Sequence, residues 1–241
     1  VGGPRQAGPM HERALAKLTL SLRVVGVRPD GFHLLESEMV TLSLADELEI
    51  TEGGDGLEIE GNDAVPPGDD NLVSRALRAA GRQAHVRLRK RIPMGGGLGG
   101  GSADAAAVLR WAGVTDLGLA ASLGADVPFC LLGGRAWVTG IGEVLEPLPF
   151  VEREFTLLTP PFGVYTPAVY KTWDELGGPT ADGPNDLEPA ALAVEPRLAA
   201  WRDTLGDATG QTPVLAGSGA TWFVEGTFEG PGLVPVRTDR P

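Results

Sequence analysis

Residues 89–106 of the chain are RKRIPMGGGLGGGSADAA, in which six glycines fall within the seven positions from Gly95 to Gly101. The preceding residues, HVRLRKRI, alternate between apolar and basic side chains, which predicts a half-exposed strand. The following residues, SADAAAVLRWAG, predict a helix with Ser102 as its N-cap. A strand, a glycine loop and a helix N-terminus direct free backbone N–H groups and the helix dipole toward one point, so we expect this loop to hold phosphate.

Two common phosphate loops do not fit this stretch. Gly95, Gly97 and Gly100 satisfy the pattern G-x-G-x-x-G, but a dinucleotide-binding fold needs a continuously apolar strand before the loop, and HVRLRKRI is not one. No Gly-Lys-Ser/Thr closes the loop, which excludes a Walker-type loop. A flexible linker is the structural alternative, and it would not be expected between a patterned strand and a helix start.

Composition limits the class of protein. The 241 residues are 42% hydrophobic, enough for the core of a soluble globular protein. No apolar run approaches the roughly 18 residues of a membrane span, and the first residues lack the apolar centre of a secretion signal, so we expect a cytoplasmic location and no membrane partner. A net charge of −12 argues against nucleic acid as a partner. Cys130 is the only cysteine, which excludes intrachain disulfides and cysteine-based zinc sites.

Alternation and turn residues predict a strand-rich first part of the chain. Residues 1–9 are rich in Gly and Pro; we expect Met10 to be the true start of the protein and order to begin near Arg13. LAKLTLSLRVVGV and FHLLESEMVTLSL predict a hairpin that turns at RPDG. DELEITEGGDGLEIEG predicts a second hairpin, and NLVSRALRAAGRQ has the spacing of a helix.

The rest of the chain predicts a second subdomain. LGLAASLG has the pattern of a short helix, and PFCLLGGRAWVTG and GEVLEPL that of strands. FTLLTP begins a part richer in Pro, Gly and Ala, for which we predict a helix from Glu188 to Leu205 and a final strand pair around TWFVE and LVPVR. We place the boundary near residue 152, which divides the chain into 10–152 and 153–241.

The stretch PMGGGLGGGSADAA resembles the phosphate loop of the superfamily of galactokinase, homoserine kinase, mevalonate kinase and phosphomevalonate kinase. AKLTLSL, RPDGFHLLES, NLVSRA, GADVPF, TPAVY, ND and AGSGATWF occur in the order found in its 4-diphosphocytidyl-2-C-methyl-D-erythritol kinase family, and DGFH with GADVP is typical of that branch. The resemblance implies an α+β fold with a ribosomal protein S5 domain 2-like N-terminal part and a ferredoxin-like C-terminal part. Residues 10–152 would then bind ATP and catalyse, and 153–241 would close over the substrate.

The same resemblance implies an ATP- and Mg²⁺-dependent kinase that phosphorylates the 2-hydroxyl of 4-diphosphocytidyl-2-C-methyl-D-erythritol in the non-mevalonate isoprenoid precursor pathway. Asp126 would be the catalytic base and Lys17 its neighbour. Chemistry agrees, because phosphoryl transfer to an alcohol needs a carboxylate to take the proton and a cation near the developing charge. Structural alternatives stay open: Lys17 shares its strand face with Thr19 and Ser21, and Asp126 could cap the turn before Pro128.

On the nucleotide side, the resemblance implies that Asn71 contacts adenine and that Lys90 lies at the edge of the nucleotide. For Lys90 the alternative is a lysine at the edge of the core, whose aliphatic stem packs on the apolar side of its strand. Ser102 is also a candidate Mg²⁺ ligand, with helix capping as its alternative role, and the other ligands are not assigned. The other implied nucleotide-binding residues are Pro93, Gly95, Gly96, Gly97, Leu98, Gly99, Gly100 and Gly101.

On the substrate side, Phe32 and Tyr170 match two aromatic residues that sandwich cytosine, and His33 matches the residue that reads the edge of the base. Without the resemblance, each aromatic residue would be assigned to the core. The remaining implied substrate residues are Thr19, Thr166, Gly217 and Gly219, the last two in a second glycine turn with Ala220.

The sequence departs from the family pattern in several places. Thr19 stands where Asn is usual, Phe32 where Tyr is usual, and Ala103 replaces a second serine after the glycine loop. The segments 111–124 and 224–241 are short, so we expect a trimmed C-terminal subdomain.

Three other functions were weighed. A sister kinase of the same superfamily would act on another small alcohol, and a non-catalytic module would bind ATP without turnover. Nucleic-acid binding on the ribosomal-protein-like part is disfavoured by the acidic balance. For the assembly we expect a monomer or a weak homodimer.

Overall fold

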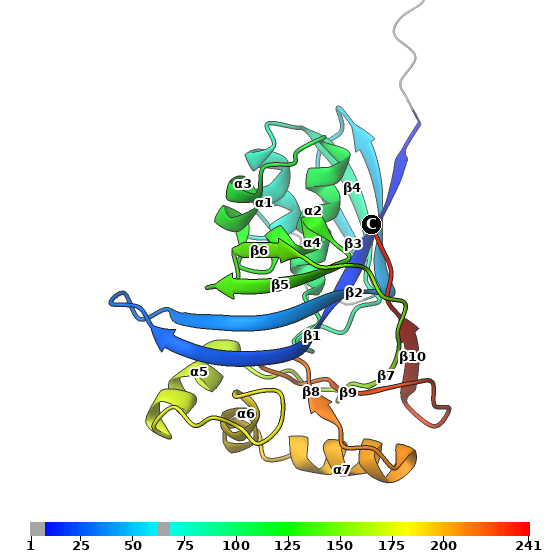
Figure 1. Cartoon of the computed structure of the whole chain (residues 1–241). Coiled ribbons are helices and arrows are strands. Elements are labelled where there is room, and N and C mark those ends of the chain that lie inside the picture. Colours follow the sequence, from blue (N-terminus) through cyan, green and yellow to red (C-terminus); the bar gives the residue numbers. More distant parts are fainter. Residues whose placement is uncertain (1–7, 62–67) are drawn as a thin grey trace, which may run out of the picture.

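The computed structural model describes residues 8–61 and 68–241. It contains a first, mixed β-sheet and a second, antiparallel β-sheet, with helices packed on them (Figure 1). Most of the Gly/Pro-rich N-terminal stretch, residues 1–7, lies outside the described residues. The strands of the first sheet are β1 Met10–Val27, β2 His33–Glu52, β3 Leu57–Glu60, β4 Ala84–Arg89, β5 Arg135–Gly140 and β6 Val144–Pro147. Its helices are α1 Leu72–Ala79, α2 Gly100–Trp111, α3 Leu117–Leu123 and α4 Val127–Leu132.

The second sheet and its helices follow in the sequence. Its strands are β7 Glu154–Leu158, β8 Val214–Leu215, β9 Trp222–Glu225 and β10 Leu233–Arg237, and its helices are α5 Thr166–Glu175, α6 Glu188–Val194 and α7 Leu198–Thr209. Helices α2 and α7 each have 12 residues, and nowhere in the described part of the chain is there a helix both long and apolar enough to cross a membrane.

The first predicted hairpin is confirmed. Strands β1 and β2 pair antiparallel from Met10 opposite Ile50 to Val27 opposite His33. The RPDG turn is closed by hydrogen bonds from the backbone N–H of Arg28 to the carbonyl of Phe32, 2.7 Å, and from that of Gly31 to the carbonyl of Arg28, 2.9 Å. The hairpin is long and curved, and its far end projects over α5 (Figure 1).

Two predictions for the first sheet are wrong. The predicted second hairpin does not form, because β4 lies between β2 and β3 and pairs antiparallel with the former and parallel with the latter. Val86 and Leu88 on β4 are buried, and this central position lets them pack on the core side of the sheet. The segment PFCLL is helix α4 and not a strand, with Pro128 in its first turn. Its apolar run is too short for periodicity to separate the two structures.

The second part also differs from prediction. The single helix expected from Glu188 to Leu205 is two helices, α6 and α7, because Pro196 interrupts them and a proline inside a helix removes a hydrogen bond and clashes with the preceding turn. The last two strands are present but do not pair with each other. The sheet order is β10-β7-β9-β8, so β7 lies between them. Helix α5 was not foreseen.

The change of sheet falls between β6 and β7, close to residue 152, and we keep the division into 10–152 and 153–241 as a proposal. The main core is shared across it, since Phe155 and Leu157 of β7 are buried with residues of β1, β2, β4 and α2. A second core lies between α5, α6, α7 and the second sheet, around Trp173 and Trp222. The C-terminal part therefore has a second core, to which Leu22 and Leu35 of the β1–β2 hairpin also contribute.

Candidate active site

A cavity of about 960 Å³ lies where the glycine loop, the β1–β2 hairpin, α5 and the turn after β8 meet. Both parts of the chain line it. Of the predicted site residues, only Gly219 is not among its lining residues. Those that line it are Lys17, Thr19, Phe32, His33, Asn71, Lys90, Pro93, Gly95, Gly96, Gly97, Leu98, Gly99, Gly100, Gly101, Ser102, Asp126, Thr166, Tyr170 and Gly217.

The glycine loop leads directly into α2, but the helix start differs from the prediction. The N-cap is Gly99, with φ of 69°, and the helix begins at Gly100, so Ser102 is not the N-cap. A left-handed residue lets the chain turn sharply into the helix, and glycine adopts it without steric cost. Ser102 lies in the first turn, where its hydroxyl borders the cavity. The first N–H groups of the helix have no acceptor within it and are free to bind an anion.

Packing alone requires glycine at Gly97 in this loop. A Cβ at Gly97, where φ is +76°, would lie 2.2 Å from the carbonyl oxygen of Ala216. The loop is tied to the second glycine turn by hydrogen bonds from the N–H of Ala220 to the carbonyl of Gly95 and from that of Thr221 to the carbonyl of Gly96, both 3.1 Å. The two glycine segments therefore form one unit on the wall of the cavity.

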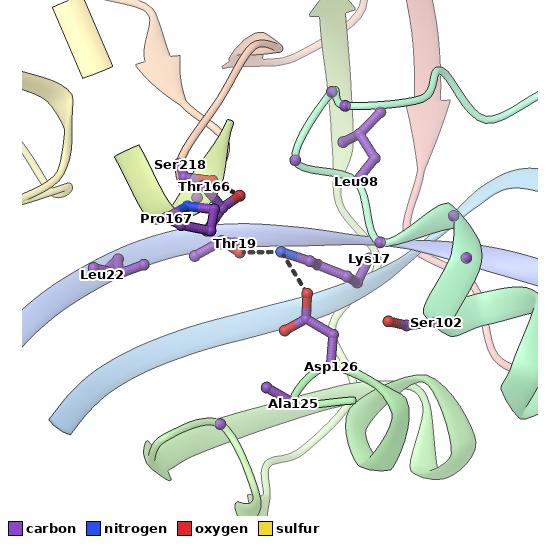
Figure 2. Close-up of a pocket in the computed structure, with 18 of the residues that line it drawn as sticks. Lys17, Thr19, Leu22, Leu98, Ser102, Ala125, Asp126, Thr166, Pro167 and Ser218 are labelled. Carbon is purple, nitrogen blue, oxygen red and sulfur yellow. Dashed lines mark hydrogen bonds and ion pairs between the residues drawn. The ribbon is translucent and has the colours of Figure 1, made fainter. Parts of the chain in front are cut away.

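Lys17 and Asp126 face each other at the base of the cavity (Figure 2). The Lys17 Nζ lies 3.4 Å from the Asp126 Oδ2 and donates to the Thr19 Oγ1 at 3.1 Å. The Lys17 side chain is buried, whereas that of Asp126 is 33% exposed and reaches the cavity. A backbone hydrogen bond from Lys17 to the carbonyl of Leu98, 3.0 Å, fixes β1 against the glycine loop.

The structural alternatives for this pair are answered by the geometry. Asp126 occupies the N-cap position of α4, but its side chain makes no capping hydrogen bond. Its carboxylate is therefore directed to the ammonium of Lys17. Lys17 does share its polar face with Thr19, and that threonine serves as a second partner for the ammonium.

Lys90 has two internal partners. Its ammonium lies 2.5 Å from the Asp46 Oδ2 and 2.7 Å from the Asp104 Oδ2; all three side chains are buried, and Lys90 and Asp104 line the cavity. Burial works against the charged ammonium, but Asp104 and Asp46 outweigh it and raise the pKa of Lys90. Burial raises the pKa of Asp104 to about 7, although Lys90 opposes this shift. The three side chains tie β2, the end of β4 and α2 together below the glycine loop.

Asn71, the predicted adenine contact, is the N-cap of α1, and its Oδ1 accepts a hydrogen bond from the N–H of Val73 at 2.9 Å. It lines the cavity together with Lys90 and the start of α2. The residues predicted to bind the nucleotide therefore line one cavity.

The hairpin and α5 bring predicted substrate residues to the same cavity. The rings of His33 and Tyr170 are stacked at a tilt with centroids 4.7 Å apart, and burial raises the pKa of Tyr170. Phe32 is exposed at the tip of the hairpin. The Thr166 and Ser218 hydroxyls are 2.7 Å apart, which joins the start of α5 to the second glycine turn (Figure 2).

The position of that turn depends on Asn185, which the sequence reasoning quoted only as part of the ND motif. Asn185 is buried, and its Nδ2 donates to the carbonyls of Leu215 and Gly217 at 2.8 and 2.7 Å. Its neighbour Asp186 accepts from the Arg23 guanidinium at 2.6 Å. Together they hold the second glycine turn and the hairpin in place.

Sequence reasoning missed three acidic residues at this cavity or beneath it: Asp46, Asp104 and Asp174. The available signal was the scarcity of lysine: a chain with only three lysines that buries two of them, Lys17 and Lys90, must supply them with carboxylates. No group of three or more His, Cys, Asp or Glu residues suited to a metal ion occurs within residues 8–61 and 68–241.

Comparison with known proteins identifies the family. The description "GHMP kinases N terminal domain" matches residues 71–134. The chain is 41% identical over 240 residues to 4-diphosphocytidyl-2-C-methyl-D-erythritol kinase of Paracoccus denitrificans, with 89% of this chain and 87% of that protein covered. The Pelotomaculum thermopropionicum enzyme of the same name is also 41% identical, over 249 residues, with 87% and 86% covered.

The chain belongs to the 4-diphosphocytidyl-2-C-methyl-D-erythritol kinase family.

A crystal structure of 4-(cytidine 5'-diphospho)-2C-methyl-D-erythritol kinase aligns with a TM-score of 0.75 and 36% identity over 89% of both chains. A homoserine kinase from Cytophaga hutchinsonii aligns with a TM-score of 0.59 at 18% identity, which supports the shared fold alone. Membership of the 4-diphosphocytidyl-2-C-methyl-D-erythritol kinase family confirms the predicted family, the α+β kinase fold and the prediction of an ATP-dependent kinase.

Proposed function

We propose that the chain transfers the γ-phosphoryl group of ATP to the 2-hydroxyl of 4-diphosphocytidyl-2-C-methyl-D-erythritol, in the non-mevalonate route to isoprenoid precursors. The relatives that match it along most of its length carry the name of this kinase. The observation that carries the proposal is the pair of Lys17 and Asp126, 3.4 Å apart beside the glycine loop. The sister kinases are the less supported alternative, because the similarity to them is confined to the fold.

Asp126 is the proposed general base. Its carboxylate is partly exposed to the cavity and makes no capping bond, so it is free to accept the proton of the hydroxyl. As the hydroxyl oxygen bonds to the γ-phosphorus, that proton moves to Asp126, and the bond from the γ-phosphorus to the bridging oxygen breaks, with ADP leaving. Lys17 holds the carboxylate in place and stabilises the negative charge that develops on the transferred group.

Two walls of the cavity would bind the two reactants. We assign ATP to the glycine loop, the start of α2, Asn71 and Lys90, because backbone N–H groups and the helix dipole attract its phosphates there. We assign the cytidine to Phe32, His33 and Tyr170 on the hairpin and α5. The acceptor hydroxyl would then lie between the two walls, near Asp126. Thr19, Thr166 and the second glycine turn complete that region.

Magnesium fits this site. Ser102 presents a hydroxyl at the first turn of α2, next to the phosphate-binding N–H groups, and Mg²⁺ prefers hard oxygen ligands such as hydroxyls, carboxylates and phosphate. Ser102 would hold the ion together with phosphate oxygens. The ion supplies neutralisation of the β- and γ-phosphate charge.

We also propose that the enzyme works in the cytoplasm as a monomer or a weak homodimer. The small, charged reactants support the cytoplasmic location. The cavity is lined by residues of one chain, which supports a monomer or a weak homodimer. Light scattering of the purified protein at several concentrations checks the assembly.

A coupled assay of ADP release tests the proposed function. The purified protein is supplied with ATP, Mg²⁺ and, in separate reactions, 4-diphosphocytidyl-2-C-methyl-D-erythritol, mevalonate and homoserine. We expect turnover with the cytidyl compound alone. Turnover only with mevalonate or homoserine would transfer the assignment to a sister kinase, and ATP binding without turnover on any acceptor would show a non-catalytic protein.

A further inference from the structure

One face of α5 surrounds the ring of His33. Tyr170, Trp173 and Asp174 have the i, i+3 and i+4 spacing that places helical side chains on one side. The ring of His33 is tilted against that of Tyr170 at 4.7 Å and meets the edge of Trp173 at 5.6 Å. The third residue, Asp174, makes a hydrogen bond of 2.8 Å between its Oδ1 and the His33 Nε2.

These contacts join two distant parts of the chain. His33 begins β2 at the tip of the long hairpin, and Asp174 follows it by 141 residues on α5 (Figure 1). The His33 side chain is only 10% exposed, and Asp174 is half exposed. Both residues line the cavity. A ring held by two aromatic contacts and one hydrogen bond has little freedom to turn. The position of its second nitrogen, Nδ1, is therefore fixed.

The hydrogen bond selects one form of the ring. A carboxylate only accepts hydrogen bonds, so the His33 Nε2 must carry the proton that it donates to Asp174. In the neutral ring, Nδ1 is then left with a lone pair and can only accept. No second hydrogen bond to the His33 ring occurs within the part of the chain that the structure describes. Nδ1 is thus an acceptor on a side chain that is nine-tenths buried and that lines the cavity.

We propose that Asp174 is a positioning residue that makes the site select cytosine over uracil. By keeping the His33 proton on Nε2, it leaves Nδ1 to accept from the exocyclic amino group of cytosine. Uracil carries a carbonyl at that position, and two acceptors facing each other cannot bond. This inference rests on the proposed function, because it needs the base to lie against His33.

The size of the selection follows from one hydrogen bond. A neutral hydrogen bond in a buried site is worth enough to change an equilibrium about tenfold, and a polar group left facing the wrong partner loses at least as much. We expect the parent protein to prefer the cytidyl substrate over its uridine diphosphate-linked analogue by tenfold or more in kcat/KM.

The test is the substitution Asp174→Asn. The amide keeps the shape of the carboxylate but can present either a donor or an acceptor to Nε2, so the proton on the ring is no longer fixed. We expect the preference for the cytidyl compound to fall about tenfold, through a higher KM for it and with the KM for ATP unchanged. The melting temperature should stay close to that of the parent, because Asp174 is half exposed.

Glu175→Gln is the matched control. Glu175 is the next residue of α5, is exposed, and pairs with Lys171 at 3.7 Å, so this variant removes the same charge from the same turn without contacting His33. Its preference between the two substrates should equal that of the parent. An equal loss of preference in both variants would mean that charge alone is sensed, and would overturn the proposal.

A spectroscopic measurement addresses the ring directly. Long-range ¹H–¹⁵N spectra of protein labelled in its three histidines, with His33 assigned from a His33→Gln variant, report which nitrogen carries the proton. We expect the Nε2–H form for His33 in the parent and a mixture of forms in Asp174→Asn. Either a parent ring protonated on Nδ1 or an unchanged cytidyl preference in the variant would refute the role of Asp174 and leave the proposed function standing. A parent that does not turn over the cytidyl substrate would instead refute the proposed function, and this inference with it.

Discussion

Replacing Lys90 by methionine separates its structural role from a nucleotide-binding role. The Lys90 side chain is 6% exposed and those of its partners, Asp46 and Asp104, are 0% and 5% exposed. In Lys90→Met, Asp46 keeps two backbone donors, the N–H groups of Arg91 and Ile92, on its Oδ1. Asp104 has no comparable donors, since its Oδ1 has no hydrogen-bond partner and its Oδ2 accepts a hydrogen bond from Lys90.

We expect a loss of unfolding free energy because this buried carboxyl group is left without its partner. Removing one partner of a buried ion pair costs about 3–5 kcal/mol of unfolding free energy. For a domain of this size each kcal/mol lowers the melting temperature by about 2–4 °C, so the variant should melt roughly 6–20 °C below the parent. A second variant, Lys90→Met with Asp104→Leu, removes the stranded carboxyl group and should recover part of this loss.

Urea unfolding followed by circular dichroism, without nucleotide, measures the effect. Lys171→Met is the control, since Lys171 is exposed on α5, and it should change the unfolding free energy by roughly 0.5 kcal/mol or less. A loss below about 1 kcal/mol in Lys90→Met would refute the structural reasoning. If the parent's ATP-induced stabilisation, about 2.7 kcal/mol at a hundred times the dissociation constant, disappeared in that variant without other loss, Lys90 would act on the nucleotide alone.

Three further predictions concern the site and its surroundings. Asp126→Asn keeps the size of the side chain but not its proton affinity, so kcat in the coupled assay should fall about a hundred- to ten-thousand-fold with ATP binding nearly unchanged; near-normal turnover would contradict its role as base. Tyr170→Ala should raise the KM for the cytidyl substrate about five- to a hundredfold while sparing ATP, whereas a loss of ATP affinity alone would mean that the two walls are exchanged. Burial raises the pKa of Cys130 to about 12, so the thiol stays protonated to well above pH 8 and a thiol reagent should label it at least about a hundredfold more slowly in the native protein than in guanidinium; fast native labelling would show that α4 opens readily.

The sequence alone was sufficient for the local features of the site. Alternation and the RPDG turn predicted the hairpin of β1 and β2, and the glycine run predicted a loop leading into a helix. These features depend on neighbouring residues, because side-chain periodicity and the conformational freedom of glycine act over a few positions. The order of the motifs was enough to identify the family and to propose the residues that line one cavity.

The exact ends and types of short elements were less accessible. PFCLL was expected to be a strand and is helix α4, and the α2 helix begins at Gly100 and not with Ser102 as its cap. A run of five apolar residues fits either structure, and the burial that favours one of them comes from the neighbouring elements. The break between α6 and α7 is an exception. Pro196 marks it in the sequence itself, although the prediction of a single helix passed over this proline.

Only the tertiary structure decided which polar groups are partners. Lys90 meets Asp46 across 44 residues and Asp104 across 14, and His33 meets Asp174 across 141. The first set depends on β4 pairing beside β2 and on α2 packing beneath it, and the second depends on α5 lying against the end of the hairpin. Strand order and helix placement are set by burial of the whole apolar surface at once, and no local pattern in the chain records which polar side chains that burial brings together.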